Sequence, residues 1–195
     1  MICREKGKIV IINSGLGNIG SLISALEFLR FDISIKDSFE KGDKTNFDGF
    51  ILPGVGSFPS GMKKIKNKNL DNLIYSLINK GIPGIGICLG MQLLAEYGNE
   101  GGIKTKGLNL FQGNVEILPK YKQAKIPNIG WNDTTLSRNQ ESWQKHLNNP
   151  FYYVHSYFVN LTRNEEELAT IDFARKLKIN VAMYKNKLLG VQFHP

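Results

Sequence analysis

Short apolar runs rich in β-branched residues alternate with segments of helical periodicity through the first half of this 195-residue chain. Strands that alternate with helices are typical of a parallel sheet, because each crossover returns the chain to the same edge. We expect strands at 8–12, 33–36, 49–52 and 85–88, and helices at 19–29, 70–79 and 89–97. The pattern predicts an α/β fold whose largely parallel central sheet is flanked by helices.

The second half of the chain, after about residue 107, is rich in strand patterns and poor in helical ones. We expect strands at 114–118, 151–159, 168–172, 181–184 and 188–193, the last two joined as a hairpin. No stretch is typical of a linker, and the length suits one core. The sequence therefore predicts a single domain, 1–195, with a mixed sheet and room for a small second antiparallel sheet.

Composition excludes several classes of function. The formal net charge of +8 comes from scattered lysines that no aromatic residues interleave, which argues against nucleic acid as a partner. The excess charge leaves open an attraction to a phosphorylated metabolite or an acidic protein. We expect neither a membrane span nor a secretory signal, and so a cytoplasmic protein with reduced thiols. The two cysteines and three histidines form no metal-site spacing, so we expect no metal.

Cys88 lies in the segment GICLG, where an apolar run meets a helical pattern. The form G-x-C-x-G is the thiol analogue of the nucleophile elbow, in which glycines make room for a strained turn. A helix that begins there would favour the thiolate, and the N–H of Leu89 could donate to an oxyanion. The alternative is a buried structural cysteine, and the pattern alone gives the two about equal weight.

A cysteine nucleophile needs a base, and the chain offers three histidines. His146 lies in a polar stretch and is expected at the surface. His155 is expected as a hydrogen-bonded residue at a strand edge. His194 directly follows an apolar strand, where open α/β sheets display reactive side chains, and it is the best candidate for the base. A structural role for His194 remains the alternative.

Two glycine-rich turns follow other predicted strands. The turn at 53–57, with the sequence PGVGS, could direct backbone N–H groups toward an anion, or could be only a tight turn. The turn at 13–18 formally matches a dinucleotide fingerprint, yet no acidic residue follows at the required place, so this match is weak.

Seven ordered segments resemble the class I, or triad, glutamine amidotransferases, and among them the glutaminase subunits of imidazole glycerol phosphate synthase. The segments are GLGN, LPGVGSF, GICLGMQLL, GLNLFQGNV, PNIGWN, FYYVHSYF and GVQFHP, and they span nearly the whole chain. The resemblance implies the fold of that family. It also implies Cys88 as the nucleophile and His194 as the general base.

The resemblance assigns further residues around these two. It implies oxyanion donors at the backbone of Leu89 and of the turn that holds Gly54 and Val55. It implies glutamine-binding residues at Gln92, Glu96, His155, Ser156 and Tyr157, with Gln92 and Glu96 at i and i+4 on one helical face. Asn18 and Trp131 match positions near a subunit interface.

The implied reaction is the hydrolysis of glutamine to glutamate and ammonia through a Cys88 thioester, without a cofactor. The ammonia would pass to a cyclase partner in a heterodimer, which forms imidazole glycerol phosphate and an aminoimidazole carboxamide ribotide in histidine biosynthesis. The classification as a hydrolase and lyase follows from this pairing. Low turnover by the isolated subunit is expected, since free ammonia would waste glutamine.

The chain departs from the family in ways that keep alternatives open. The family continues after His-Pro with an acidic residue that orients the histidine, whereas this sequence stops at Pro195, so we expect that a C-terminal segment is missing. Asn13 and Asn128 replace an aspartate and a histidine that are frequent there. Similar glutaminases supply ammonia to an amidino-sugar-forming enzyme of surface polysaccharide pathways, which is a second hypothesis for this chain. A catalytically inactive regulatory relative is the third hypothesis.

Overall fold

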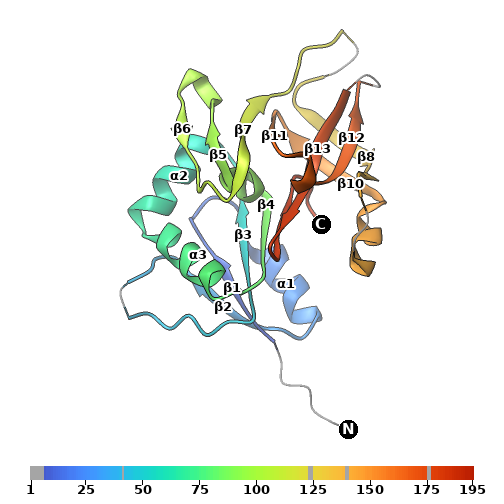
Figure 1. The fold of residues 1–195 in the computed structure, drawn as a ribbon. Helices are drawn as coiled ribbons and strands as arrows, with labels where there is room; N and C mark the ends of the chain where they lie inside the picture. The colour runs from blue at the N-terminus through green and yellow to red at the C-terminus, as the bar shows by residue number, and fades with distance from the viewer. Residues whose placement is uncertain (1–6, 41, 123–124, 139–140, 175–176) are drawn as a thin grey trace.

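The computed structural model describes residues 7–40, 42–122, 125–138, 141–174 and 177–195. An eight-stranded sheet runs through the molecule in the order β2-β1-β3-β4-β14-β13-β12-β9 (Figure 1). Its strands are β1 (Lys8–Ile12), β2 (Asp32–Lys36), β3 (Gly49–Gly54), β4 (Gly84–Cys88), β9 (Thr135–Leu136), β12 (Glu167–Phe173), β13 (Leu177–Lys185) and β14 (Leu188–Val191). The first five strands in this order pair in parallel and the rest antiparallel. The prediction of a largely parallel central sheet is confirmed.

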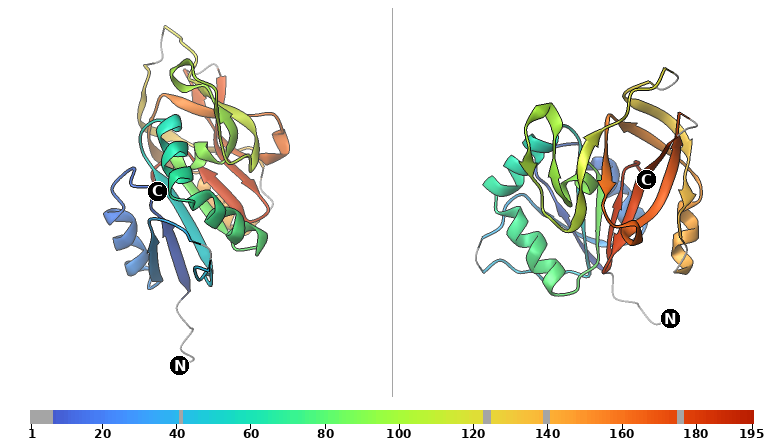
Figure 2. Two further views of the ribbon diagram at one scale, coloured as in Figure 1. Left: turned by 90° about the vertical axis from the view of Figure 1, so that its left-hand side faces the viewer. Right: turned by 45° about the horizontal axis from the view of Figure 1, so that its top comes forward.

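Helices cover both faces of the parallel part. They are α1 (Gly20–Phe28), α2 (Phe58–Asn67), α3 (Leu70–Asn79) and the short α4 (Leu89–Leu93). Helix α1 lies on one face, and α2 and α3 lie on the other (Figures 1 and 2). In α3 the buried residues follow an i, i+3, i+4, i+7 spacing, which places one apolar stripe against the sheet: Leu70, Leu73, Ile74 and Leu77.

The core divides at the sheet because side chains alternate along each strand. Val10 and Ile12 of β1 belong to the apolar cluster that includes α2 and α3. Ile87 of β4 and Val191 of β14 belong to a second cluster, built largely from the β-rich half. The inner parallel strands β1, β3, β4 and β14 are therefore largely buried, which explains their near-continuous apolar sequences.

The second half adds two smaller sheets. Strands β8 (Asn128–Asp133) and β10 (Pro150–His155) pair antiparallel. The other sheet has the order β11-β7-β5-β6, formed by β5 (Ala95–Gly98), β6 (Thr105–Lys106), β7 (Phe111–Ile117) and β11 (Tyr157–Leu161). Three 3-10 turns complete the elements of the described residues: η1 (Glu100–Gly102), η2 (Ser142–Leu147) and η3 (Asn164–Glu166).

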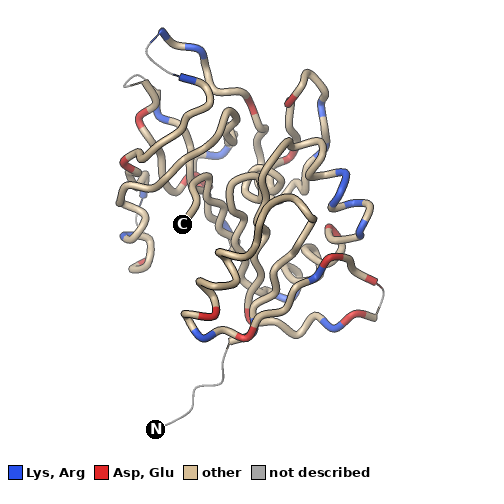
Figure 3. Tube along the Cα trace, turned by 180° about the vertical axis from the view of Figure 1, so that it is seen from behind, with Lys and Arg blue, Asp and Glu red and all other residues tan. Residues whose placement is uncertain are grey.

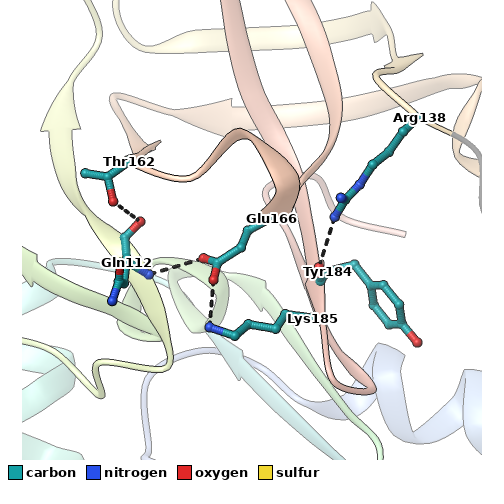
Figure 4. A network of polar contacts seen from close by, with 6 residues as sticks. All are labelled: Gln112, Arg138, Thr162, Glu166, Tyr184 and Lys185. Carbon is teal, nitrogen blue, oxygen red and sulfur yellow. Dashed lines mark hydrogen bonds and ion pairs between the residues drawn. The ribbon is translucent and has the colours of Figure 1, made fainter.

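A buried carboxylate joins the four-stranded sheet to the main sheet. Glu166 is 3% exposed, accepts a hydrogen bond from the Gln112 backbone N–H of β7 at 3.3 Å, and pairs with Lys185 Nζ of β13 at 2.6 Å (Figure 4). Nearby, Thr162 donates to the Gln112 carbonyl and Arg138 to the Tyr184 carbonyl. A buried charge with both a cationic and an N–H partner fixes the relative position of the two sheets.

Several element predictions need correction. The helix expected at 89–97 ends at Leu93, because Ala95–Gly98 pairs with β7 as a strand. The strand expected at 151–159 is two strands in different sheets, since the chain changes sheet at Ser156. Helix α2 and strand β8 were not predicted from the sequence. The hairpin of β13 and β14 is confirmed.

Lys and Arg residues are spread along the chain, with a concentration in α2 (Figure 3). None of the described helices is both long and apolar enough to cross a membrane.

Candidate active site

A pocket of about 270 Å³ opens at the carboxyl ends of β3 and β4, beside the segment that follows β14. These strands are parallel neighbours, so their ends meet at one edge of the sheet. The pocket is lined by Val55, Gly56, Cys88, Leu89, Gln92, Glu100, Val154, His155, Ser156, Tyr157 and His194. The fold thus brings together residues that are up to 139 positions apart, from Val55 to His194.

Cys88 ends β4 and immediately precedes α4, as the elbow prediction requires. Its backbone has φ 54° and ψ −111°, a strained conformation for a residue with a side chain. A Cβ on Gly90 would lie 1.8 Å from the Leu52 carbonyl oxygen, and one on Gly86 would lie 2.8 Å from the Gly90 carbonyl oxygen. The flanking glycines are therefore required by close backbone packing, and the thiol is held at the pocket wall.

A chain of hydrogen bonds leads from the thiol to the opposite wall of the pocket. Gln192 Nε2 lies 3.6 Å from Cys88 Sγ, and Gln192 Oε1 accepts from Gln92 Nε2 at 3.0 Å. Gln92 Nε2 also donates to the Tyr157 carbonyl at 3.2 Å. His155 Nδ1 reaches the same carbonyl at 2.9 Å, and Asn128 Nδ2 reaches His155 Nε2 at 3.0 Å.

Burial raises the pKa of the Cys88 thiol, while hydrogen bonds from the Leu89 backbone and from Gln192 oppose that rise. The thiol form therefore prevails at neutral pH, and the sulfur needs a base to become a nucleophile.

His194 supplies an imidazole at the same pocket. Its backbone N–H donates to the Tyr152 carbonyl at 3.1 Å in an isolated antiparallel bridge, which anchors the segment beyond β14 beside β10. Partial desolvation lowers the pKa of the His194 ring. A neutral imidazole at pH 7 is able to accept a proton from a thiol. Among the described residues, no carboxylate forms an ion pair with His194.

The other two histidines have different surroundings. His155 is 5% exposed, and burial lowers the pKa of its ring to about 4. Because the Tyr157 carbonyl can only accept, the proton of His155 lies on Nδ1 and Nε2 accepts from Asn128. His155 is thus a neutral, fixed part of the pocket wall. His146 is exposed in η2, as predicted.

Known proteins resemble the chain over almost its whole length. The family Glutamine amidotransferase class-I matches residues 10–195. The imidazole glycerol phosphate synthase subunit HisH of Caldanaerobacter subterraneus subsp. tengcongensis is 39% identical over 186 residues, which are 95% of this chain and 88% of the relative. The chain belongs to the class-I glutamine amidotransferases.

Two further comparisons agree with this family. The HisH subunit of Moorella thermoacetica is 37% identical over 188 residues, 96% of this chain and 86% of that relative. A glutamine amidotransferase of Thermotoga maritima has a TM-score of 0.68 at 17% identity, over 98% of this chain and 76% of that structure, and so shares the fold. The amidotransferase fold predicted from the sequence is confirmed.

The backbone N–H groups predicted as oxyanion donors of this amidotransferase differ in their hydrogen-bond partners. Leu89 begins α4 and its N–H is directed at Cys88, beside the pocket. Gly54 pairs with Cys88 at the end of β3. The N–H of Val55, however, donates to the Leu16 carbonyl at 3.3 Å. In this structure the Val55 amide is therefore not free to receive an oxyanion, in contrast to the prediction.

Glu96 was expected one helical turn after Gln92, but this geometry is wrong. Helix α4 ends at Leu93, so Glu96 lies on β5, where its side chain is exposed and outside the pocket lining. The carboxylate that does line the pocket is Glu100 of η1, which accepts a hydrogen bond from the Phe58 N–H at 2.6 Å. Glu100 could have been predicted from the sequence only if the helix had been expected to end before residue 95.

Ser156 and Tyr157 line the pocket at the point where the chain passes from β10 to β11. Gln192 was not predicted as a site residue, although it lies two positions before His194 in the segment GVQFHP. Its burial and its contact with Cys88 appear only in the folded chain. In the described part of the chain, no group of three or more His, Cys, Asp or Glu side chains could hold a metal ion.

The two predicted interface residues are both at the surface. Asn18 accepts a hydrogen bond from the Gly20 N–H at the start of α1. Trp131 is 72% exposed on β8 and packs edge-on against Tyr152 of β10, with ring centroids 5.9 Å apart. Ile129 and Val154 are also exposed apolar residues of these two strands, and Val154 reaches the pocket. An apolar strip thus runs from the surface of the β8–β10 sheet to the mouth of the pocket.

Proposed function

We propose that this chain is the glutaminase subunit of an imidazole glycerol phosphate synthase. It hydrolyses glutamine to glutamate and ammonia, and a cyclase partner uses the ammonia to form imidazole glycerol phosphate and an aminoimidazole carboxamide ribotide in histidine biosynthesis. The observation that carries the proposal is the pocket that the strained Cys88 and His194 both line. The similarity to HisH subunits over some 95% of the chain supports the pathway.

The reaction begins when His194 takes the proton of Cys88. The thiolate attacks the side-chain amide carbon of glutamine, and the carbonyl oxygen becomes an oxyanion. The imidazolium then protonates the nitrogen, the C–N bond breaks, and ammonia leaves a thioester on Cys88. Water, activated by the neutral His194, attacks the thioester; the C–S bond breaks and the proton returns to sulfur. Glutamate is released and the free thiol of Cys88 is regenerated.

The resting state of the Val55 amide supports a low basal rate. Leu89 offers one oxyanion donor, while the Val55 N–H is held by the Leu16 carbonyl. Loss of one such donor typically costs about a hundredfold to a thousandfold in rate. Docking of the cyclase would turn this peptide toward the pocket and so couple ammonia release to its use.

Glu100, rather than Glu96, would bind the α-ammonium group of the substrate. The Glu100 carboxylate lines the pocket, and one of its oxygens is occupied by the Phe58 N–H. A carboxylate has lone pairs on both oxygens, so an ammonium group can still be accepted. Gln92, Ser156 and Tyr157 complete the glutamine site.

The cyclase would dock against the apolar strip of Ile129, Trp131, Tyr152 and Val154, and the exposed Asn18 would be a further contact. We place the reaction in the cytoplasm, and we take residues 1–195 as one glutaminase domain.

The test measures glutamate release from glutamine, with and without a cyclase partner and its ribotide. We expect slow release alone and strong stimulation by partner and ribotide. Cys88→Ala should lose at least about four orders of magnitude in kcat because the thioester cannot form. Cys3→Ser is the matched control and should keep wild-type activity. Stimulation only by a sugar-amidating partner would favour the polysaccharide pathway, and no release under any condition would favour an inactive regulatory protein.

A further inference from the structure

Gln192 is a fully buried polar side chain beside the reactive sulfur, with 0% of its surface exposed. A buried amide is costly unless its hydrogen-bonding groups are paired. Both ends of this amide are paired: Oε1 accepts from Gln92 at 3.0 Å, and Nε2 faces Cys88 Sγ at 3.6 Å.

The direction of this amide follows from its neighbours. The Tyr157 carbonyl can only accept, so the atom of Gln92 that contacts it must be the NH₂ group. The same NH₂ group donates its second proton to Gln192, which must therefore present its oxygen. The NH₂ group of Gln192 is consequently directed at Cys88. The Tyr157 carbonyl thus fixes the direction of the hydrogen bonds that run through Gln92 and Gln192 to the sulfur.

We infer that Gln192 is a positioning residue that holds Cys88 Sγ at the pocket wall and stabilises its thiolate through the Nε2–H donor. The inference rests on the proposed glutaminase function. When the Cys88 proton passes to His194, the sulfur gains a negative charge in a buried place, and the Gln192 donor strengthens against that charge. It acts again when the thioester breaks and the sulfur leaves as a thiolate.

Helix α4 alone is a weak source of this stabilisation. It contains five residues rather than the nine expected from the sequence, so few peptide dipoles align behind Cys88. A side-chain donor fixed by two further residues supplies what the short helix does not.

The test follows the alkylation of Cys88 by iodoacetamide as a function of pH, in a Cys3→Ser background so that one thiol reacts. Gln192→Met keeps the length of the side chain and removes the donor. We expect the midpoint of the rate profile to rise by about one pH unit, as for loss of a hydrogen bond to a charged group. Gln112→Met, the same change at an exposed position of β7, is the matched control and should leave the midpoint unchanged.

Gln192→Glu is the second variant. It keeps an acceptor for Gln92 but places a carboxylate beside the sulfur, so its midpoint should lie above that of Gln192→Met. Circular dichroism identifies the variants that fold, and either folded variant decides the matter. An unchanged midpoint, or an equal shift in Gln112→Met, overturns the inference. Alkylation needs no glutamine turnover, so a failure here is distinct from an absence of glutaminase activity.

Discussion

Two glycine-rich turns stand side by side at the carboxyl ends of β3 and β4, and they are built in opposite ways. At the elbow after β4, a Cβ on Gly90 would meet the Leu52 carbonyl oxygen at 1.8 Å. In the turn after β3, a Cβ on Gly56 would meet nothing within 4 Å, and Gly56 is required only by its φ of 104°. The elbow is closed by backbone packing, whereas the neighbouring turn has open space at Gly56.

The difference divides the pocket into a fixed half and an adjustable half. Cys88 belongs to the fixed half, with the hydrogen-bond chain through Gln192 and Gln92 to the Tyr157 carbonyl. Val55 belongs to the adjustable half: it is 46% exposed and its N–H is held by a single carbonyl. Packed structures resist small movements, so a control point for the reaction is expected where packing is looser.

The largest expected effect is that of Gly90→Ala. The added methyl group overlaps the backbone of β3, which cannot yield without moving the sheet, and we expect a loss of at least about 3 kcal/mol of unfolding free energy. Urea denaturation followed by circular dichroism measures this. A loss below about 1 kcal/mol would show that the elbow is as loosely packed as the neighbouring turn.

His155 contacts the same Tyr157 carbonyl as Gln92 and so belongs to the fixed half. Its burial predicts that the stability of the protein depends on pH. Its pKa is about 4 in the folded protein and about 6.5 when unfolded, so the unfolded chain binds the extra proton between these values. Stability is therefore lost as the pH falls from 6.5 toward 4, by about 2 kcal/mol between pH 7 and pH 5. In a plot of unfolding free energy against pH, His155→Gln should remove this loss between pH 7 and pH 5. His146→Gln, at an exposed position, is the control and should retain it. Equal profiles for wild type and His155→Gln would contradict a buried neutral imidazole.

Gly56→Ala tests the open turn. The methyl group meets no neighbour, so only the positive φ costs energy, about 1 to 2 kcal/mol. The same urea titration should place it clearly below Gly90→Ala. A loss as large as that of Gly90→Ala would mean that the turn is packed in a way that the structure does not show.

The same contrast explains what could be predicted from the sequence. The parallel sheet followed from apolar runs separated by helical patterns, and the elbow followed from glycines two residues either side of Cys88, because these signals are local. Glu100 and Gln192 could not be found in this way. The first depends on a helix that ends early to form β5, and the second on a contact between residues 88 and 192.

The smallest expected effect concerns two lysines that restrain the adjustable half, Lys64 of α2 and Lys68 directly after it. Lys64 Nζ donates to the Gly15 carbonyl at 3.0 Å and Lys68 Nζ to the Ser14 carbonyl at 3.3 Å, next to Leu16, whose carbonyl holds Val55. The double variant Lys64→Met and Lys68→Met should lose less than about 1 kcal/mol of stability, since such partly exposed contacts contribute little.

Its effect on activity should still be measurable, because the same loop holds the Val55 amide away from the pocket. A looser loop frees that oxyanion donor more often, so basal glutamate release should rise a few-fold while the partner-stimulated rate changes less. Lys63→Met, at an exposed position of the same helix, is the control and should leave both rates unchanged. An unchanged or lower basal rate in the double variant would place the restraint on Val55 elsewhere, in the turn itself rather than in the loop that faces it.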